Sequence, residues 1–438
     1  MQSGNLKRYH IILLGLAIGL LAGCGSSQEE ISGLSGVYGT GAETAGIEAD
    51  EMAVLGDESA SSSPEEGDET AGSTESGEDV AGNASPQDKD KATEVTPTTV
   101  SILMAGDMLL HTRVEESALT ADGSYDYEAV FANVADTIAQ ADIAIANQEV
   151  IIGGSELGIS GYPAFNAPYE FADALVDVGF DVACQGTNHA LDKGGRGITN
   201  CLDYWADNYP NMGVLGIHDS YEDQEEIYYT TVNGITVAIL NYTYGTNGIS
   251  LPSDMPYAVD YLSQDRVVSD LQEAEENADF TIVCPHWGTE YQLTEDSSQK
   301  KWAQIFTENG ADLIIGTHPH VIEPIEWVEV PNGNTALCYY SLGNFVNWTG
   351  GEGQGVANRM VGGLAEVTIG KMTDGSVRIA DYDAEALVSH VTSGTKGVTV
   401  YKLSEYTEEL AQANEIRKQD GQFSLEYCHN LVSQVWGK

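Results

Sequence analysis

The segment Asp312-Leu313-Ile314-Ile315-Gly316-Thr317-His318-Pro319-His320 joins a short apolar run to a polar loop. The apolar part is typical of a buried strand. Gly316 opens a turn, and Pro319 fixes its own φ and cannot donate to a ladder, so the two histidines stand on a stiff loop at a strand end. Two imidazoles held in this way suit a metal site, although two unrelated loop histidines would give the same local sequence.

The same pattern, an apolar run followed by polar residues, recurs along the chain. The six clusters are Gly106-Asp107, Asn147-Gln148-Glu149, Asn188-His189, His286-Trp287-Gly288, His318-Pro319-His320 and Ser341-Leu342-Gly343-Asn344-Phe345. Stretches with helical spacing at 127–140, 168–178 and 299–309 separate several of them, which indicates an α/β fold of strand–loop–helix units. In an open α/β sheet the carboxyl ends of the strands converge on one edge, where ligands bind. We therefore expect the six clusters to face one site.

Paired β structure is predicted in the middle of the chain and again near its end. Residues 226–232 and 235–242 flank Asn233-Gly234, which is a strong hairpin signal. A second hairpin is expected from 362–369 and 377–383, and the chain from about 403 has the spacing of one or two helices.

Composition restricts the class of protein. The chain has 438 residues, of which 42% are apolar, and a formal net charge of −50. Such a charge argues against nucleic acid as a partner, because phosphate binding needs clustered Lys and Arg. Apart from Cys24, five cysteines remain, and an odd number fits no disulfide framework. Cys184, Cys284 and Cys338 lie in apolar runs and are expected to be small core residues.

The N-terminus predicts export and a lipid anchor. A short basic segment with Lys7 and Arg8 precedes the apolar stretch 11–21, which ends in Leu21-Ala22-Gly23-Cys24. This ending resembles a bacterial lipobox, so we predict a signal peptide over 1–23, lipidation of Cys24 and an extracytoplasmic position on the cell membrane. The alternatives are an ordinary signal peptide or a membrane helix that contains a cysteine.

Three further segments follow the predicted signal peptide. Residues 24–97 comprise the lipidated Cys and an acidic stretch rich in Ser, Gly and Glu, which we interpret as a disordered tether. Residues 98–390 would form the main domain and residues 391–438 a C-terminal helical extension.

The clusters supply carboxylates, an amide oxygen and imidazoles, a mixture that suits Mn²⁺, Fe²⁺ or Zn²⁺. A bridging carboxylate surrounded by His, Asp and Asn is what a two-metal hydrolytic centre requires. Each residue alone has a simpler interpretation: Asp107 as a turn or N-cap residue, Glu149 as a solvated loop carboxylate, Asn188-His189 as a turn, and His286 as the partner of Trp287 in an aromatic pair. The joint pattern favours the metal site.

These motifs resemble those of the CapA/PgsA family of capsule or poly-γ-glutamate synthesis proteins, which are related to calcineurin-like metallophosphoesterases. The matching motifs, in order, are Gly106-Asp107, Asn147-x-Glu149, Asn188-His189-Ala190-Leu191-Asp192-x-Gly194, His286-Trp287-Gly288-x-Glu290-Tyr291, Gly316-x-His318-Pro319-His320-Val321 and Ser341-Leu342-Gly343-Asn344-Phe345. The resemblance covers about residues 99 to 350. It implies a metallophosphoesterase-like sandwich of two mixed β-sheets flanked by helices.

The resemblance also implies roles for single residues. Asp107 and His320 would bind a first metal, Asn188, His286 and His318 a second, and Glu149 would bridge them. His189 would be the acid that faces the leaving group. Asp192 would support it, or would simply cap the helix that follows. Trp287, Glu290, Tyr291 and Asn344 would contact substrate, with core packing as the alternative for the two aromatic residues.

Two departures from the phosphoesterases concern the first metal. The position two residues after Asp107, where they carry a histidine, is Leu109, and the bridging position is Glu149 in place of Asp. His111 is the alternative source of an imidazole there.

Two functions remain open at this point. The first is a metal-dependent hydrolase that acts on a cell-surface polymer or phosphoester. The second is a non-enzymatic accessory that anchors or guides an anionic polymer during export, in contact with a synthase or export complex.

Overall fold

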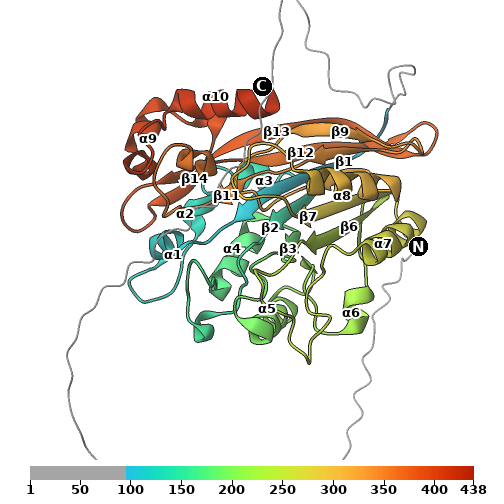
Figure 1. Ribbon diagram of the computed structural model, residues 1–438, viewed down its shortest axis with the longest axis horizontal. Helices are drawn as coiled ribbons and strands as arrows, with labels where there is room; N and C mark the ends of the chain where they lie inside the picture. The colour runs from blue at the N-terminus through green and yellow to red at the C-terminus, as the bar shows by residue number, and fades with distance from the viewer. Residues whose placement is uncertain (1–94) are drawn as a thin grey trace, which may run out of the picture. The chain divides into compact units, whose positions relative to one another are not determined.

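The computed structural model describes residues 95–438, with side chains from residue 98 (Figure 1). The predicted signal peptide, Cys24 and nearly all of the predicted tether lie outside the described residues. The described residues all belong to one compact unit of the chain. No helix among them is long and apolar enough to cross a membrane.

The first sheet has eight strands in the order β14-β13-β12-β1-β2-β3-β4, with β11 paired to β1. Its strands are β1 (Val95–Met108), β2 (Ile143–Asn147), β3 (Val182–Cys184), β4 (Gly213–Leu215), β11 (Asn344–Val346), β12 (Val361–Met372), β13 (Val377–Val391) and β14 (Val398–Lys402). β1 to β4 run parallel, β11 is parallel to β1, and β12 to β14 are antiparallel. The carboxyl ends of β1, β2 and β3 therefore lie at one edge.

The second sheet has six strands in the order β5-β6-β7-β8-β10-β9. They are β5 (Tyr228–Val232), β6 (Ile235–Thr243), β7 (Phe280–His286), β8 (Leu313–Ile315), β9 (Ile325–Glu329) and β10 (Thr335–Tyr339). The predicted hairpin at Asn233-Gly234 is confirmed as β5–β6, and β6, β7, β8 and β10 run parallel.

Side-chain alternation along β1 shows why the two sheets stack. Ile102 and Met104 enter the apolar layer shared with β6, β7, β8 and β10, whereas Leu103 and Ala105 face the other way, into the layer packed against helices. A strand segment buried on both faces is continuously apolar, as residues 102–105 of β1 are. The predicted sandwich of two mixed sheets flanked by helices is thereby confirmed.

The helices cover the outer faces of both sheets (Figure 1). They are α1 (Thr112–Ala118), α2 (Glu128–Phe131), α3 (Ala135–Ile138), α4 (Tyr169–Val178), α5 (Gly194–Asn208), α6 (Tyr221–Glu225), α7 (Gln264–Asn277), α8 (Ser297–Glu308), α9 (Glu408–Ala413) and α10 (Leu425–Trp436). α7 and α8 pack on the second sheet, and α1 to α5 with α10 supply apolar residues to the layer over the first sheet.

Three local features differ from or add to the sequence interpretation. The helix expected over 127–140 is broken into α2 and α3, and between them the Asn133 side chain donates to the Val400 carbonyl at 3.2 Å. This tertiary contact lies outside the reach of periodicity. The segment 391–438, expected to be helical, first contributes β14, whose alternating Val398 and Val400 are buried. Cys184, Cys284 and Cys338 are buried free thiols, as predicted for core residues.

Candidate metal centre

Strand ends from both sheets deliver polar side chains to one place. Asp107 lies at the end of β1, and its backbone N–H donates to the Gly343 carbonyl at 2.9 Å. A Cβ at position 106 would lie 2.1 Å from that same carbonyl oxygen, so only glycine allows this approach. Glycine is therefore required at position 106 so that the backbone can bring the Asp107 carboxylate beside the Ser341–Phe345 loop.

The histidine loop after β8 holds two residues in the left-handed region, with φ of 99° at His318 and 60° at His320. Such non-glycine conformations cost on the order of 1–3 kcal/mol each. Four of the six non-glycine residues with positive φ in the described chain surround the site: Asn247, Tyr291, His318 and His320. Residues with strained backbone conformations are therefore concentrated around the imidazoles of the site.

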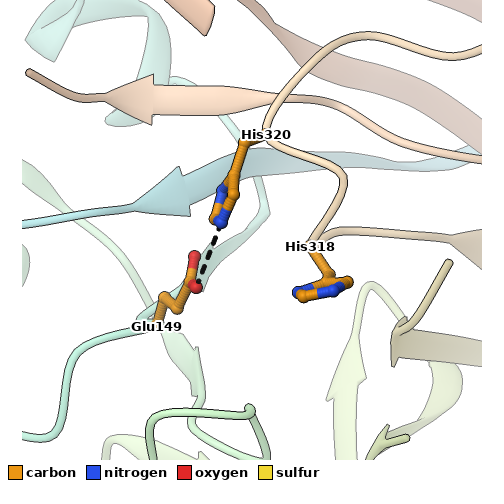
Figure 2. A group of neighbouring side chains, drawn as sticks. All are labelled: Glu149, His318 and His320. Atoms are coloured by element: carbon orange, nitrogen blue, oxygen red, sulfur yellow. Dashed lines mark ion pairs between the residues drawn. The ribbon is translucent and has the colours of Figure 1, made fainter. Parts of the chain in front are cut away.

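Glu149, two residues after β2, is the centre of the group. Its carboxylate is fully buried, and neither oxygen has a hydrogen-bond partner. Nε2 of His320 lies 3.6 Å from Oε1, and Nε2 of His189 and of His286 each lie 3.9 Å from the same oxygen. Figure 2 shows the carboxylate directed toward His320, with His318 on the same loop beside it. A buried carboxylate without donors costs several kcal/mol unless a cation compensates it.

One side of Glu149 is formed by Asp107 and His320. His320 Nδ1 lies 3.0 Å from Asp107 Oδ2 and 3.1 Å from Asn344 Oδ1. Asp107 also accepts from the Asn147 side chain at 2.9 Å and from the His318 backbone N–H at 3.2 Å. These contacts fix both residues against the first sheet.

The other side is formed by Asn188, His286 and His318. His286 Nε2 lies 2.9 Å from Asn188 Oδ1, and its Nδ1 lies 3.0 Å from the Thr317 hydroxyl. The rings of His286 and His318 are 4.9 Å apart, and Nδ1 of His318 is buried without a partner. The structure thus brings all six predicted ligands together.

Burial governs the protonation of this group. It raises the pKa of Glu149 and lowers the pKa values of His286 and His318 well below the ordinary range, the latter two with help from neighbouring imidazoles. Burial also lowers the pKa of His320, but the carboxylates of Glu149 and Asp107 outweigh it and raise that pKa to about 9. His286 and His318 are therefore neutral, which is the form that binds a cation.

His189 is oriented by a carboxylate. Its Nδ1 lies 2.7 Å from Asp192 Oδ2, and that same oxygen accepts from the Phe165 N–H at 2.7 Å. The Phe165 ring packs edge-on against the imidazole at 4.7 Å. Nε2 therefore lies on the side of Glu149, 3.9 Å from its Oε1.

The four residues predicted to contact substrate lie in different environments. Tyr291 is 42% exposed and its ring lies 6.0 Å from that of His320, while Glu290 is exposed beside it. Asn344 is fully buried and holds His320 in place. Trp287 is 1% exposed in the core against Phe306, so the structure places it where the core-packing alternative put it.

Three residues near the site were not predicted from the sequence. The Tyr244 ring packs at a tilt of 46° against His318, with ring centroids 4.6 Å apart. Asn247 contacts the side chains of Asn188 and His189 at 3.3 and 3.4 Å, and the Arg359 guanidinium lies 3.5 Å over the Tyr291 ring. Tyr244 follows directly after β6, so the strand-end rule could have found it. Asn247 and Arg359 carry no local signal.

Leu109 occupies the position where the phosphoesterases have a histidine, and His111 is the alternative source of an imidazole. Leu109 is buried in the core, and His111 packs at 5.1 Å against Phe165. Burial, together with His320 and His189, lowers the pKa of His111 to about 4, so it is neutral near the site. The compact group of possible ligand atoms is Glu149, His318 and His320, all within 4.8 Å of one another.

The orphaned oxygens of Glu149 and the orphaned Nδ1 of His318 fit a bound cation, since each is a buried ligand atom that no protein donor satisfies. Fold and site together define a class: an α/β sandwich that gathers carboxylate, amide and imidazole groups at the ends of its parallel strands.

The chain belongs to the family described as bacterial capsule synthesis protein PGA_cap, whose model matches residues 101–349. It is 35% identical over 185 residues to the PGA biosynthesis protein CapA of Bacillus subtilis, covering 41% of this chain and 47% of that protein. It is 26% identical over 266 residues to the capsule biosynthesis protein CapA of Bacillus anthracis, covering 57% and 61% respectively. The chain thus spans about half to three-fifths of the length of these relatives.

Solved structures give more distant matches. The NAD nucleotidase of Haemophilus influenzae matches with 14% identity and a TM-score of 0.42, over 72% of this chain and 61% of that one. A 5'-nucleotidase precursor from Thermus thermophilus matches with 15% identity and a TM-score of 0.41, over 66% and 54%.

Proposed function

We propose that this protein is a metal-dependent hydrolase of phosphoester type that acts in the synthesis of a capsule polymer such as poly-γ-glutamate. The observation that carries the proposal is the fully buried Glu149 carboxylate, which has no donor and faces three imidazole nitrogens at 3.6–3.9 Å. Among the described residues, Glu149 is the one whose two carboxylate oxygens are both buried without a partner, which is costly in a group built only for stability.

The arrangement supports two divalent ions of the Mn²⁺, Fe²⁺ or Zn²⁺ type. Asp107 and His320 would hold one, Asn188, His286 and His318 the other, with Glu149 between them. Cations in such a site polarise a phosphoryl oxygen and supply a nucleophile at neutral pH.

His189 is the residue proposed to deliver a proton. The Asp192 carboxylate at 2.7 Å fixes the Nδ1 side of the ring and favours a proton there. This leaves Nε2, on the side of Glu149, to exchange a proton with the leaving oxygen of a bound ester.

The lipobox-like segment ending at Cys24 supports an extracytoplasmic, lipid-anchored position, where a capsule polymer is handled. The family assignment supports the polymer as partner, together with its synthase or export complex.

The test is hydrolysis of p-nitrophenyl phosphate and its bis ester by the full chain after loading with Mn²⁺. We expect activity that Glu149→Ala and His318→Ala abolish and that the distant variant His218→Ala retains. A chain that loads metal but cleaves neither ester at any tested pH overturns the catalytic proposal. Polymer production in cells by His318→Ala at the wild-type level would favour the accessory role.

A further inference from the structure

Arg359 has no carboxylate partner among the residues that the structure describes. Its guanidinium donates to the Thr349 hydroxyl at 2.9 Å and covers the Tyr291 ring at 3.5 Å. No acidic oxygen lies within 4.0 Å of it among residues 98–438, as is also the case for Arg196 and Arg417, whereas Arg113 and Arg266 have one at 2.5 and 2.6 Å. Of the three without an acidic partner among these residues, Arg359 is the one that contacts a residue beside the histidine loop. In a chain with 68 acidic and 18 basic residues, a half-buried arginine beside the candidate site without a counter-ion is a candidate for binding an anion.

Hydrogen bonds connect both Tyr291 and Arg359 to the histidine loop of the metal centre, the first directly and the second through Asn344. The Tyr291 N–H donates to the Pro319 carbonyl at 2.8 Å, between the two histidines. The Arg359 carbonyl accepts from the Asn344 side chain at 2.9 Å, and Asn344 Oδ1 lies 3.1 Å from His320 Nδ1. Arg359 begins the turn into β12 at the end of a 3-10 helix (Val356–Met360), beyond the residues that the family model matches.

The Tyr291 ring orients the Arg359 guanidinium but supplies no negative charge to pair with it. An aromatic face holds the plane of the group without using its N–H donors, and the fork of donors matches a carboxylate or phosphate bidentately. The formal net charge of −50 repels anionic ligands at long range, so a local cation is needed to hold one.

We propose that Arg359, oriented by Tyr291, is the anion-binding residue of this site, and that it holds a carboxylate or phosphate of the ligand beside the metal centre. The ligand class is thus one that carries an anionic group next to the reacting group. The inference rests on the proposed function for the identity of the neighbouring centre, but the binding contact itself belongs to Arg359.

The test is calorimetric titration of the Mn²⁺-treated full chain with two probes, inorganic phosphate and a short γ-linked glutamate oligomer. We expect Arg359→Gln to weaken binding of at least one probe by about tenfold or more, because a charge-assisted, bidentate contact is lost. Loss toward phosphate alone assigns the residue to a phosphate group, and loss toward the oligomer alone assigns it to a carboxylate. Bound Mn²⁺, measured in the same samples, should be unchanged.

Matched variants separate recognition from stability. Arg378→Gln is the control. Arg378 pairs with Asp374 at the β12–β13 turn, which lies beside the start of β1, whereas Asp107 lies at the end of that strand. It should bind both probes as wild type does. Tyr291→Leu should weaken binding, because the ring that orients the Arg359 guanidinium is lost.

Two results overturn the proposal: wild-type affinity for both probes in Arg359→Gln, or, if that variant does not fold, wild-type affinity in Tyr291→Leu. Failure of the proposed function gives a different pattern. In that case wild type holds no metal and cleaves no ester, while binding of a probe still depends on Arg359.

Discussion

Two histidine–carboxylate clusters in this molecule differ in how completely their polar atoms are paired. Around His218, Nδ1 lies 3.2 Å from Asp223 and Nε2 lies 2.7 Å from Asp260, whose other oxygen accepts from Gln224 at 3.0 Å. Around Glu149, three imidazoles approach to 3.6–3.9 Å, but neither carboxylate oxygen accepts a hydrogen bond. In the first cluster both ring nitrogens of His218 have carboxylate partners. In the second the unpaired oxygens of Glu149 fit an additional cation.

Backbone conformation differs in the same way. His218 is absent from the positive-φ residues of the described chain, while His318 and His320 both belong to them. A self-sufficient ion pair needs no strained backbone. The metal-site loop tolerates strain because the surrounding contacts, such as the His318 N–H to Asp107, determine its shape.

The largest expected effect concerns metal affinity. His318→Ala removes a ligand and should weaken Mn²⁺ or Zn²⁺ binding by at least about a hundredfold, more than the loss of a group that only orients a ligand. His218→Ala should leave the metal content unchanged. Metal analysis after dialysis measures both, and equal loss in the two variants would remove the distinction between the clusters.

Metal should also stabilise the fold through one cluster alone. At a free concentration one hundred times its dissociation constant, the ion should add about 2.7 kcal/mol to the free energy of unfolding. Denaturant titration with and without Mn²⁺ should show this shift in wild type and in His218→Ala. The same shift in Glu149→Ala would show that the ion binds elsewhere.

The His218 cluster should make its own contribution to the pH dependence of stability outside the metal site. Burial lowers the pKa of His218, but Asp223 and Asp260 outweigh burial and raise it to about 9. Because this folded-state pKa exceeds the unfolded value of 6.5, the stabilisation is complete below pH 6.5 and is lost as pH rises through 9. We expect a loss of about 2 kcal/mol, allowing for the exposure of Asp223. His218→Gln should remove this part of the loss between pH 6.5 and 9, and the same loss in that variant as in wild type would contradict the assignment.

The smallest effect is expected at Asp223, whose side chain is 44% exposed. Asp223→Asn should cost less than about 1 kcal/mol of unfolding free energy, since an exposed ion pair contributes little. Thermal unfolding at low salt measures it. A cost above about 2 kcal/mol would show that Asp260 alone is not a sufficient partner for His218.

Much of the fold and site could be predicted because both follow from strand periodicity. Apolar runs locate β1, β2, β3, β7 and β8, and parallel strands bring their carboxyl ends together. The candidate ligands could therefore be grouped from sequence alone: Asp107, Glu149, Asn188, His286, His318 and His320. Their joint presence, together with the resemblance to the CapA/PgsA family, carried the prediction.

What the sequence could not provide depends on tertiary packing. The burial of Trp287 follows from its packing against Gly316 and Phe306. The contact of Arg359 with Tyr291 joins residues 68 positions apart in the sequence. The break between α2 and α3 has the same origin, since Asn133 contacts a strand 267 residues away.

The decisive measurement for a metal site at Glu149 is anomalous diffraction from crystals of the protein grown with Mn²⁺. We expect anomalous peaks within coordination distance of Glu149, with His318 or His320 as further ligands, and none at His218. A metal-loaded crystal whose anomalous peaks lie away from Glu149 would contradict it.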